Sequence, residues 1–279
     1  MKFWLNGKII ENSDTSGAVS ARSAGLTLGW GVFTTLGVRD GAPRFLERHF
    51  GRLQRDANAA DVPFDLDFPT ISKALNAVLR ANNIENGHAR LTLTRRDDGR
   101  WNLENGADLS IFALETADSS GELRAQLSPH RTEAKRALAG VKITSYLPYF
   151  WAWREAKKRG YDEAILRDGE DVWCEGARST IFWVKNGELF TPSLETGCLR
   201  GIGRDLALEW AAFQGIPVHQ GRFQNREAET ADEMWLVSAA TGTRPLRALH
   251  DESGAKRMEF NGKNEMCAEF SRWLEAQSE

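Results

Sequence analysis

Tight-turn dipeptides recur between runs of residues that favour β-strands, and they constrain the fold of this chain more than any other feature. They are Asn6-Gly7, Asp40-Gly41, Asp168-Gly169 and Asn186-Gly187. Asn-Gly and Asp-Gly pairs adopt the left-handed backbone that a two-residue β-hairpin needs, and strands joined in this way run antiparallel. We therefore expect an α+β fold of mostly antiparallel sheets with flanking helices, and not a doubly wound parallel sheet.

Strand and helix patterns alternate along most of the 279 residues. Short β-prone runs predict strands, and apolar residues at helical spacing predict helices. Besides a hairpin at Asn6-Gly7, the expected strands are 32–38, 43–45, 89–94, 109–114, 141–145, 163–166, 172–174, 181–184, 189–191 and 233–237. The expected helices contain residues 46–57, 71–79, 148–160, 205–214 and 266–274.

One polar, turn-rich stretch, residues 115–122, interrupts this alternation. Such a stretch is typical of a linker between domains. We expect a small N-terminal α+β domain over residues 1–117, a linker over 118–127 and a larger C-terminal domain over 128–279. A cleft between two such domains is where ligands usually bind.

Charge and cysteine content exclude several classes of protein. The net charge is −3 with acids and bases interspersed, which gives no sign of a nucleic-acid-binding surface. The scattered cysteines Cys174, Cys198 and Cys267 argue against a disulfide framework and favour a reducing compartment. No apolar run is long enough to span a bilayer or to form a signal peptide. We expect a cytoplasmic protein without nucleic-acid or membrane partners.

Lys142 interrupts the apolar run 139–147, directly before the helix expected over 148–160. A lysine on a strand beside a pocket can be desolvated, which lowers the pKa of its amine and lets it form a Schiff base. A lysine on an exposed edge strand would give the same local pattern. The segments that follow Lys142 favour the catalytic interpretation.

A glycine-rich segment, residues 200–204, precedes the helix expected over 205–214. Backbone amides at a helix start, together with the positive end of the helix dipole, bind anions. A dinucleotide fingerprint would need a glycine where Leu206 stands and a strand immediately before it. A phosphate monoester therefore fits better, and a simple glycine-rich helix start fits equally well.

Glu175 and Arg52 are further candidates for ligand binding. Glu175 ends a β-prone run, where a carboxylate can hold a proton on a heteroaromatic nitrogen or simply face water. Arg52 follows His49 by three residues on one helix face, and it can bind a phosphate with two hydrogen bonds or lie at the surface. The histidines show no metal-ligand spacing, and no Gly-x-Ser-x-Gly motif indicates a hydrolase.

Taken in order, these segments resemble the fold-type IV enzymes that depend on pyridoxal 5′-phosphate (PLP). This class contains branched-chain and D-amino-acid aminotransferases, (R)-amine transaminases and aminodeoxychorismate lyases. The resemblance runs from Trp4 to about Leu249 and is most specific from Lys142 to Arg204. In that stretch the matching segments are the lysine run, 160–164, 175–176, Phe182, 191–192 and 201–204, in the order and spacing of the class.

The resemblance implies roles for individual residues. Lys142 would form the aldimine with PLP and then move the proton of the reaction. Glu175 would keep the pyridine nitrogen protonated, which maintains the electron sink. Arg52 would bind the phosphate together with the backbone amides of Ile202 and Gly203.

Other implied positions vary more within the class. Tyr146 lies near the position that contacts the phenolic oxygen of the cofactor, one residue closer to the lysine than in branched-chain enzymes. Arg95 resembles a carboxylate-binding position, and Arg90 is a second candidate that should face the opposite side of the same strand. Phe33 and Thr35 are expected to contact the substrate.

Two positions of the expected phosphate site depart from the class pattern. Gly203 stands where threonine is usual, and Ala240 where threonine or serine is usual. Each lost hydrogen bond should cost on the order of 1 kcal/mol of cofactor affinity. Ser238 or Thr241 can supply a replacement hydroxyl.

The resemblance leaves the reaction open between a transaminase and a lyase. Thr34, where aminotransferases usually have glutamate, resembles some lyases, whereas the loop 238–242 is closer to the transaminases. We favour an aminotransferase acting on an amino donor and a 2-oxo acid, with aminodeoxychorismate lyase as the alternative. A non-catalytic phosphate-binding protein would leave Lys142 without a task. The class also implies a homodimer.

Overall fold

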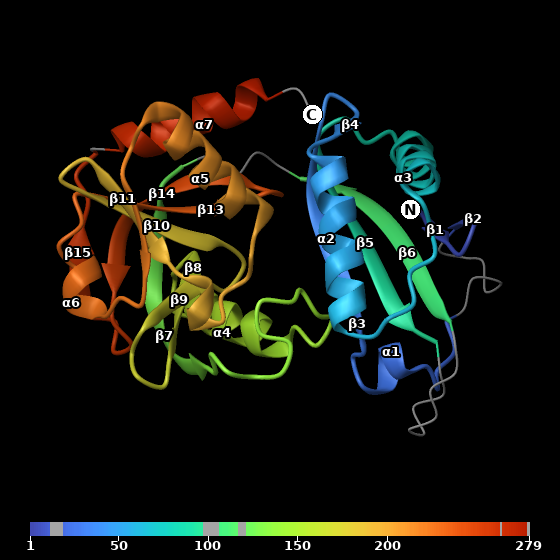
Figure 1. Cartoon of the computed structure of the whole chain (residues 1–279), viewed down its shortest axis with the longest axis horizontal. Helices are drawn as coiled ribbons and strands as arrows, with labels where there is room; N and C mark the ends of the chain where they lie inside the picture. The colour runs from blue at the N-terminus through green and yellow to red at the C-terminus, as the bar shows by residue number, and fades with distance from the viewer. Residues whose placement is uncertain (12–18, 97–105, 117–120, 263, 278–279) are drawn as a thin grey trace. The chain divides into compact units, whose positions relative to one another are not determined.

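The computed structural model describes residues 1–11, 19–96, 106–116, 121–262 and 264–277 (Figure 1). Its contacts divide the chain into two units. Unit 1 consists of the described residues up to 116 together with Val141–Tyr146, and unit 2 consists of residues 121–140 and those from Leu147 onward. The division at 117 and 128 stays a prediction, and residues 118–120 of the expected linker lie outside the described residues.

Unit 1 is a six-stranded sheet with strand order β2-β1-β6-β5-β3-β4. Every registered strand pair in it is antiparallel. Its elements are β1 (Lys2–Leu5), β2 (Lys8–Glu11), α1 (Ala24–Thr27), β3 (Gly31–Arg39), β4 (Ala42–Pro43), α2 (Leu46–Ala59), α3 (Phe68–Asn82), β5 (Gly87–Arg95) and β6 (Ala107–Glu115).

The two faces of this sheet differ in composition. Buried residues alternate along β5, with Ala89, Leu91 and Leu93 in the core formed with helices α2 and α3 (Figure 1). This is the period of two that a strand with one covered face requires. Arg90 and Thr92 point to the other face, where they pair with residues of β3. The sheet therefore separates an apolar core from a polar surface.

The segment Val141–Tyr146 does not form the strand expected over 141–145. It makes a single antiparallel bridge, between Val32 and Ile143. At this point the edge of β3 is open, because β4 pairs only with Val38 and Arg39. The chain touches that edge over one bridge and then enters α4 (Leu147–Lys158), so the run is too short for a strand.

Unit 2 is built on a nine-stranded sheet. Eight strands follow the order β12-β11-β10-β13-β14-β7-β8-β9, and β15 pairs with β14. Besides α4, the elements are β7 (Leu123–Thr132), β8 (Glu163–Asp168), β9 (Trp173–Gly176), β10 (Thr180–Lys185), β11 (Glu188–Pro192), η2 (Leu194–Thr196), α5 (Ile202–Gln214), β12 (Val218–Gly221), α6 (Asn225–Ala228), β13 (Glu233–Ser238), β14 (Gly242–His250), β15 (Lys256–Glu259) and α7 (Glu265–Ala276).

Strand β7 contains residues 123–127 of the expected linker. Leu123, Ala125 and Leu127 are buried, and the strand pairs in parallel with both β14 and β8. Its polar residues and Pro129 conceal the alternation in the sequence. The remaining pairs of this sheet are antiparallel except β11 with β12, so the expectation of an α+β fold with mostly antiparallel sheets is confirmed.

Two helices in unit 2 position candidate residues. Helix α4 matches the helix expected over 148–160 and ends before Gly160, whose φ of +87° favours glycine. Helix α5 begins at Ile202, three residues earlier than expected, with Gly201 as its N-cap. The glycine-rich segment therefore forms the first turn of a helix. Among the described residues, no helix is long and apolar enough to cross a membrane.

Candidate functional site

Lys142 lies against two aromatic rings in unit 1. Its Nζ atom is 4.6 Å from the centroid of the Phe33 ring and 4.8 Å from that of Tyr146. The two rings meet edge to face, with 5.3 Å between their centroids. Aromatic faces attract a cation and exclude water from one side of it. The Lys142 side chain is half-buried, and its amine lies beside two rings and not in open solvent.

The backbone of Lys142 is held by residues distant in sequence. Its amide donates to the Asp56 carboxylate at 3.1 Å, and its carbonyl accepts from the Phe33 amide at 2.9 Å. Two residues later, the Thr144 amide donates to the Gly31 carbonyl at 2.8 Å. Asp56 is buried on the inner side of α2. The lysine is therefore anchored on both sides, which limits where its amine can reach.

Arg52 is buried beside a hydroxyl and an imidazole. Its Nη2 donates to Thr34 Oγ1 at 2.5 Å, and that oxygen lies 2.6 Å from His49 Nδ1. Burial, followed by the positive charges of Arg52 and Lys142, lowers the pKa of His49 well below its usual value. A neutral His49 accepts the Thr34 proton at Nδ1, so its own proton is on Nε2. Within the described residues, Nε2 has no hydrogen-bond partner.

Arg90 lies on the same side of the sheet as Lys142. Its guanidinium carbon is 3.7 Å from the centroid of the Phe33 ring, and its Nε donates to Thr92 Oγ1 at 3.1 Å. Burial lowers the pKa of Arg90. Thr35 pairs with Arg90 between β3 and β5, so both side chains point to one face. The structure thus brings Arg90, Phe33 and Thr35 together with the lysine.

Arg95 occupies a different environment. Its Nη1 forms an ion pair with Asp61 at 3.0 Å, and its guanidinium carbon lies 4.8 Å from the centroid of the Trp30 ring. The residue is 3% exposed and belongs to the core side of β5, opposite to Arg90. Of the two arginines suggested for a carboxylate, Arg90 is the one that shares a cluster with Lys142.

Glu175 is the corresponding anion of unit 2. It lies in β9, is 7% exposed, and accepts hydrogen bonds on both carboxylate oxygens. The Leu199 amide donates to Oε2 at 3.1 Å, and the Tyr149 hydroxyl donates to Oε1 at 3.3 Å. Hydrogen bonds to the charged form stabilise a buried carboxylate. The sequence also allowed Glu175 to face water, and this burial does not fit that alternative.

The first turn of α5 lies against the end of β13 in unit 2. A Cβ atom added at Gly203 would be 2.9 Å from Val237 Cγ2 and 3.3 Å from the Ala239 amide nitrogen. A side chain in this place would therefore displace the neighbouring backbone or Val237. The close approach explains the glycine where the class usually has threonine, and it brings the amides of Ile202 and Gly203 next to the loop that follows β13.

The loop after β13 contains the other predicted hydroxyl. Ser238 Oγ lies 2.8 Å from Thr241 Oγ1 and accepts from the Thr241 amide at 3.1 Å. Ala240 is between them, and Gly242 closes the turn with a φ of +69°. Ser238 and Thr241 therefore supply hydroxyls on the loop where Ala240 has none.

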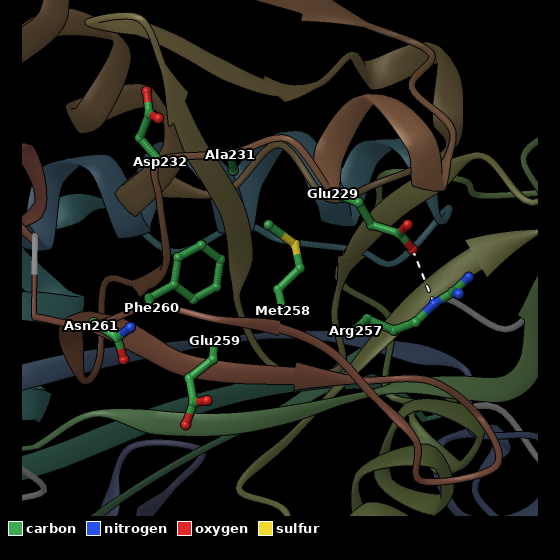
Figure 2. A pocket seen from close by; sticks show the side chains of 8 residues that line it. All are labelled: Glu229, Ala231, Asp232, Arg257, Met258, Glu259, Phe260 and Asn261. Atoms are coloured by element: carbon green, nitrogen blue, oxygen red, sulfur yellow. Dashed lines mark ion pairs between the residues drawn. The ribbon is translucent and has the colours of Figure 1, made fainter.

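A cavity of about 350 Å³ elsewhere in unit 2 contains none of the residues predicted for a site (Figure 2). An ion pair between Arg257 Nε and Glu229 Oε1, 3.2 Å long, lies at one end of it. It is lined by Glu229, Ala231, Asp232, Arg257, Met258, Glu259, Phe260 and Asn261. These side chains include no lysine, so the cavity has no amine comparable to that of Lys142.

Residues 31–249, most of the chain, match the family Amino-transferase class IV. The chain belongs to this family. A putative branched-chain-amino-acid aminotransferase of Methanocaldococcus jannaschii is 31% identical over 252 residues, which cover 88% of this chain and 87% of the relative. Aminodeoxychorismate lyase of Bacillus subtilis is 27% identical over 263 residues, 89% of this chain and 86% of the relative.

A solved structure gives the same result for the fold. The branched-chain aminotransferase of Thermoproteus uzoniensis, crystallised with norvaline, matches with a TM-score of 0.86 and 27% identity. The match covers 100% of this chain and 96% of that one. The chain has the fold-type IV architecture, as the sequence resemblance implied.

Class IV aminotransferases depend on PLP, and the residues of this one fit the cofactor. Unit 1 offers an anchored lysine amine at Lys142 and a buried guanidinium at Arg52, suited to an aldehyde and a phosphate. Unit 2 offers a buried carboxylate at Glu175 and a helix start at Ile202, suited to a protonated ring nitrogen and an anion. The role of each residue stays a prediction.

Sequence reasoning missed several polar contacts of this chain. His49, Arg52 and Asp56 share the buried face of α2 with Leu53 and Ala57. Charged or polar residues at helical spacing within an apolar stripe indicate buried networks, so this signal was present in the sequence. The unpredicted contacts are Thr34 with Arg52 and His49, Asp56 with the Lys142 amide, and Tyr149 and Leu199 with Glu175.

Proposed function

We propose that this protein uses PLP to move an amino group from an amino acid or amine to a 2-oxo acid. The observation that carries the proposal is the position of Lys142. Its amine lies against the Phe33 and Tyr146 rings, and its backbone is held by Asp56. Such an amine can act as a nucleophile towards an aldehyde and as a base in the following proton transfers.

PLP, when bound, supplies an electron sink for the pair of electrons left when the Cα–H bond of the donor breaks. In unit 1, the Lys142 amine would take up that proton and return it. Arg52, hydrogen-bonded to Thr34, would bind the phosphate, and Tyr146 would contact the phenolic oxygen. Neutral His49 adds no second positive charge beside the Arg52 guanidinium, which is itself always charged.

In unit 2, Glu175 would hold a proton on the ring nitrogen. Its donors, Tyr149 and Leu199, keep both carboxylate oxygens oriented. The amides of Ile202 and Gly203, at the first turn of α5, would bind the phosphate, assisted by the hydroxyl of Thr241.

The substrate carboxylate would be bound by Arg90. This guanidinium shares the Phe33 ring with the Lys142 amine, so a carboxylate bound there is close to the reacting nitrogen. Phe33 and Thr35 would contact the rest of the substrate. The ion pair of Arg95 with Asp61 makes Arg95 the weaker candidate.

A second candidate reaction is that of aminodeoxychorismate lyase. The Bacillus subtilis relative with that name covers 89% of this chain, and Thr34 stands where aminotransferases usually have glutamate. Both reactions start with the same amine and cofactor and differ in the fate of the substrate. The choice between them therefore depends on substrate tests.

The deciding experiment is a visible absorption spectrum of the purified protein with PLP. We expect a band from the lysine-bound cofactor that bleaches with an L-amino acid, a D-amino acid or (R)-1-phenylethylamine and returns with a 2-oxo acid. A band that none of these donors bleaches, together with release of p-aminobenzoate from aminodeoxychorismate, would establish the lyase. A protein that binds no PLP would contradict both.

The family relationship also supports a homodimer, in which the neighbouring subunit contributes a loop to each site. Light scattering on the eluting protein would test this, with an expected mass of about twice the 31.2 kDa of one chain. A mass of one chain for the active protein would contradict it. A cytoplasmic location remains a prediction as well.

A further inference from the structure

A guanidinium and a phenol stand behind Glu175 in unit 2. Arg136 Nη2 donates to the Tyr149 hydroxyl oxygen at 2.6 Å, and this hydroxyl donates to Glu175 Oε1 at 3.3 Å. The resemblance to known enzymes assigned no role to Tyr149 or Arg136. The three groups form a chain that runs from a fixed positive charge to the carboxylate.

Arg136 is held in place by other hydrogen bonds. Its Nη1 donates to Thr132 Oγ1 at 2.9 Å and to the Glu133 carbonyl at 2.8 Å, and its Nη2 also reaches the Gly197 carbonyl at 3.0 Å. A guanidinium with this many partners loses little freedom when it binds Tyr149. The positive charge is therefore at a fixed distance from the phenol.

The phenol transmits this charge to Glu175. A hydrogen bond received from a cation makes a hydroxyl a stronger donor, because bonds in a chain polarise one another. Burial and the negative charge of Glu175 raise the pKa of Tyr149 well above its usual value. Tyr149 therefore keeps its proton at neutral pH and remains a donor to the carboxylate.

The surroundings of Glu175 make this donor important. The neighbouring thiols of Cys174 and Cys198 are buried, and burial, together with the charge of Glu175, raises their pKa to about 12 and about 11. Both thiols stay neutral at physiological pH and so contribute no charge. In such an environment, a carboxylate depends on hydrogen-bond donors to remain ionised.

We infer that Tyr149 and Arg136 are positioning residues that keep Glu175 ionised and oriented for the ring nitrogen of the cofactor. The inference rests on the proposed function. It predicts that loss of the phenolic hydroxyl weakens PLP binding, with the larger loss at acidic pH. Without its donor, Glu175 takes up a proton more easily and can no longer pair with a protonated ring.

The test compares Tyr149→Phe with Tyr161→Phe. Tyr161 is in the same unit, and its hydroxyl donates to the Gly254 carbonyl at 3.5 Å. PLP dissociation constants are measured by tryptophan fluorescence between pH 5.5 and 8.5. We expect Tyr149→Phe to bind about 5- to 10-fold more weakly at pH 7.5. We also expect the acidic loss of PLP binding to begin at a higher pH in Tyr149→Phe than in wild type. Tyr161→Phe should bind PLP like wild type at every pH.

Two further variants separate positioning from a general loss of structure. Arg136→Lys retains a cation. It should recover at least half of the PLP-binding free energy that is lost in Arg136→Gln. In a Glu175→Gln background, Tyr149→Phe should have no further effect on PLP binding, because the carboxylate through which it acts is gone. The two Arg136 variants also serve if Tyr149→Phe does not fold.

The outcomes distinguish the inference from the proposed function. If wild type binds PLP and Tyr149→Phe has the affinity and pH profile of Tyr161→Phe, the inference is wrong and the proposed function stands. The inference is also wrong, and the proposed function also stands, if Tyr149→Phe weakens PLP binding as much in a Glu175→Gln background as it does in wild type. If wild type binds no PLP, both are wrong.

Discussion

The candidate residues of the two units differ in how they hold charge. Unit 1 holds cations in two places: Lys142 and Arg90 lie together against the Phe33 ring, and Arg52 donates to the Thr34 hydroxyl. Unit 2 surrounds one anion, Glu175, with hydrogen-bond donors. Like charges in one cluster repel, and a bound anion relieves the repulsion. Unit 1 is therefore suited to phosphate and carboxylate groups, and unit 2 to a protonated ring.

Removal of the lysine from the cluster of unit 1 should have the largest effect. Lys142→Ala is expected to abolish the visible band of the bound cofactor and to lower kcat by a factor on the order of 10³ or more, because the nucleophile and the base are lost together. Lys157→Ala, which removes a lysine paired with Asp162 at the surface, is the control. Turnover by Lys142→Ala within tenfold of wild type would contradict the role of unit 1.

Removal of a cation that does not react should have a smaller effect. Arg52→Gln is expected to weaken PLP binding by about 2 kcal/mol, or roughly 30-fold, because hydrogen bonds to charged groups are worth about 1.5–3 kcal/mol. Equilibrium titration with PLP measures the loss. Arg80→Gln, on the exposed side of α3, should bind like wild type. Equal affinities for both variants would remove Arg52 from the phosphate site.

The hydroxyl that separates Arg52 from His49 should contribute to stability. Thr34→Val has nearly the same shape but cannot bond to either neighbour, so its free energy of unfolding should fall by about 1–2 kcal/mol. Thr34→Ser retains the hydroxyl and should lose less. Urea unfolding of the two variants measures the difference. If valine is tolerated as well as serine, the hydroxyl has no structural part in the cation cluster.

The buried titratable groups of the two units should respond to pH in opposite directions. The pKa of His49 lies well below 6.5, so only the unfolded chain takes up its proton as the pH falls below about 6.5, and acid destabilises unit 1. Burial raises the pKa of Glu233 from 4.5 to about 7, so the folded chain keeps a proton that the unfolded chain releases between these values. A pH rise through that window therefore destabilises unit 2.

Urea unfolding between pH 5 and 8 tests both signs. His49→Asn should reduce the loss of stability on the acid side, and Glu233→Gln should reduce the loss as the pH rises towards 7. Each slope is at most about 1.4 kcal/mol per pH unit. The comparison between the units is wrong if both variants change the pH dependence in the same direction.

Local signals in the sequence predicted much of the fold. Each turn dipeptide joins an antiparallel strand pair, and Asn6, Asp40 and Asn186 adopt positive φ values of 47°, 50° and 53°. Strand β7 escaped prediction because its polar residues are compatible with a loop. The parallel pairs of β7 also depend on β8 and β14, which are far away in sequence. Local propensity contains no information about such partners.

The same limit applies to the candidate site. The residue types and spacing identified Lys142, Glu175 and Arg52, but their partners come from other segments. The contact of Tyr149 with Glu175 spans 26 residues, and that of the Lys142 amide with Asp56 spans 86. Residue types and local spacing do not predict these partners, because the partners are brought together only by the folded chain.

The return of Val141–Tyr146 to unit 1 has a consequence for biosynthesis. A nascent chain emerges from the ribosome with its N-terminal part first. Until residue 144 is available, the Gly31 carbonyl lacks its Thr144 partner, and until residue 142 is available, the Phe33 amide lacks the Lys142 carbonyl. A strand edge with unpaired groups attracts other chains. Ribosomes that stall before this segment should therefore expose an aggregation-prone intermediate, which chaperones have to protect until translation resumes.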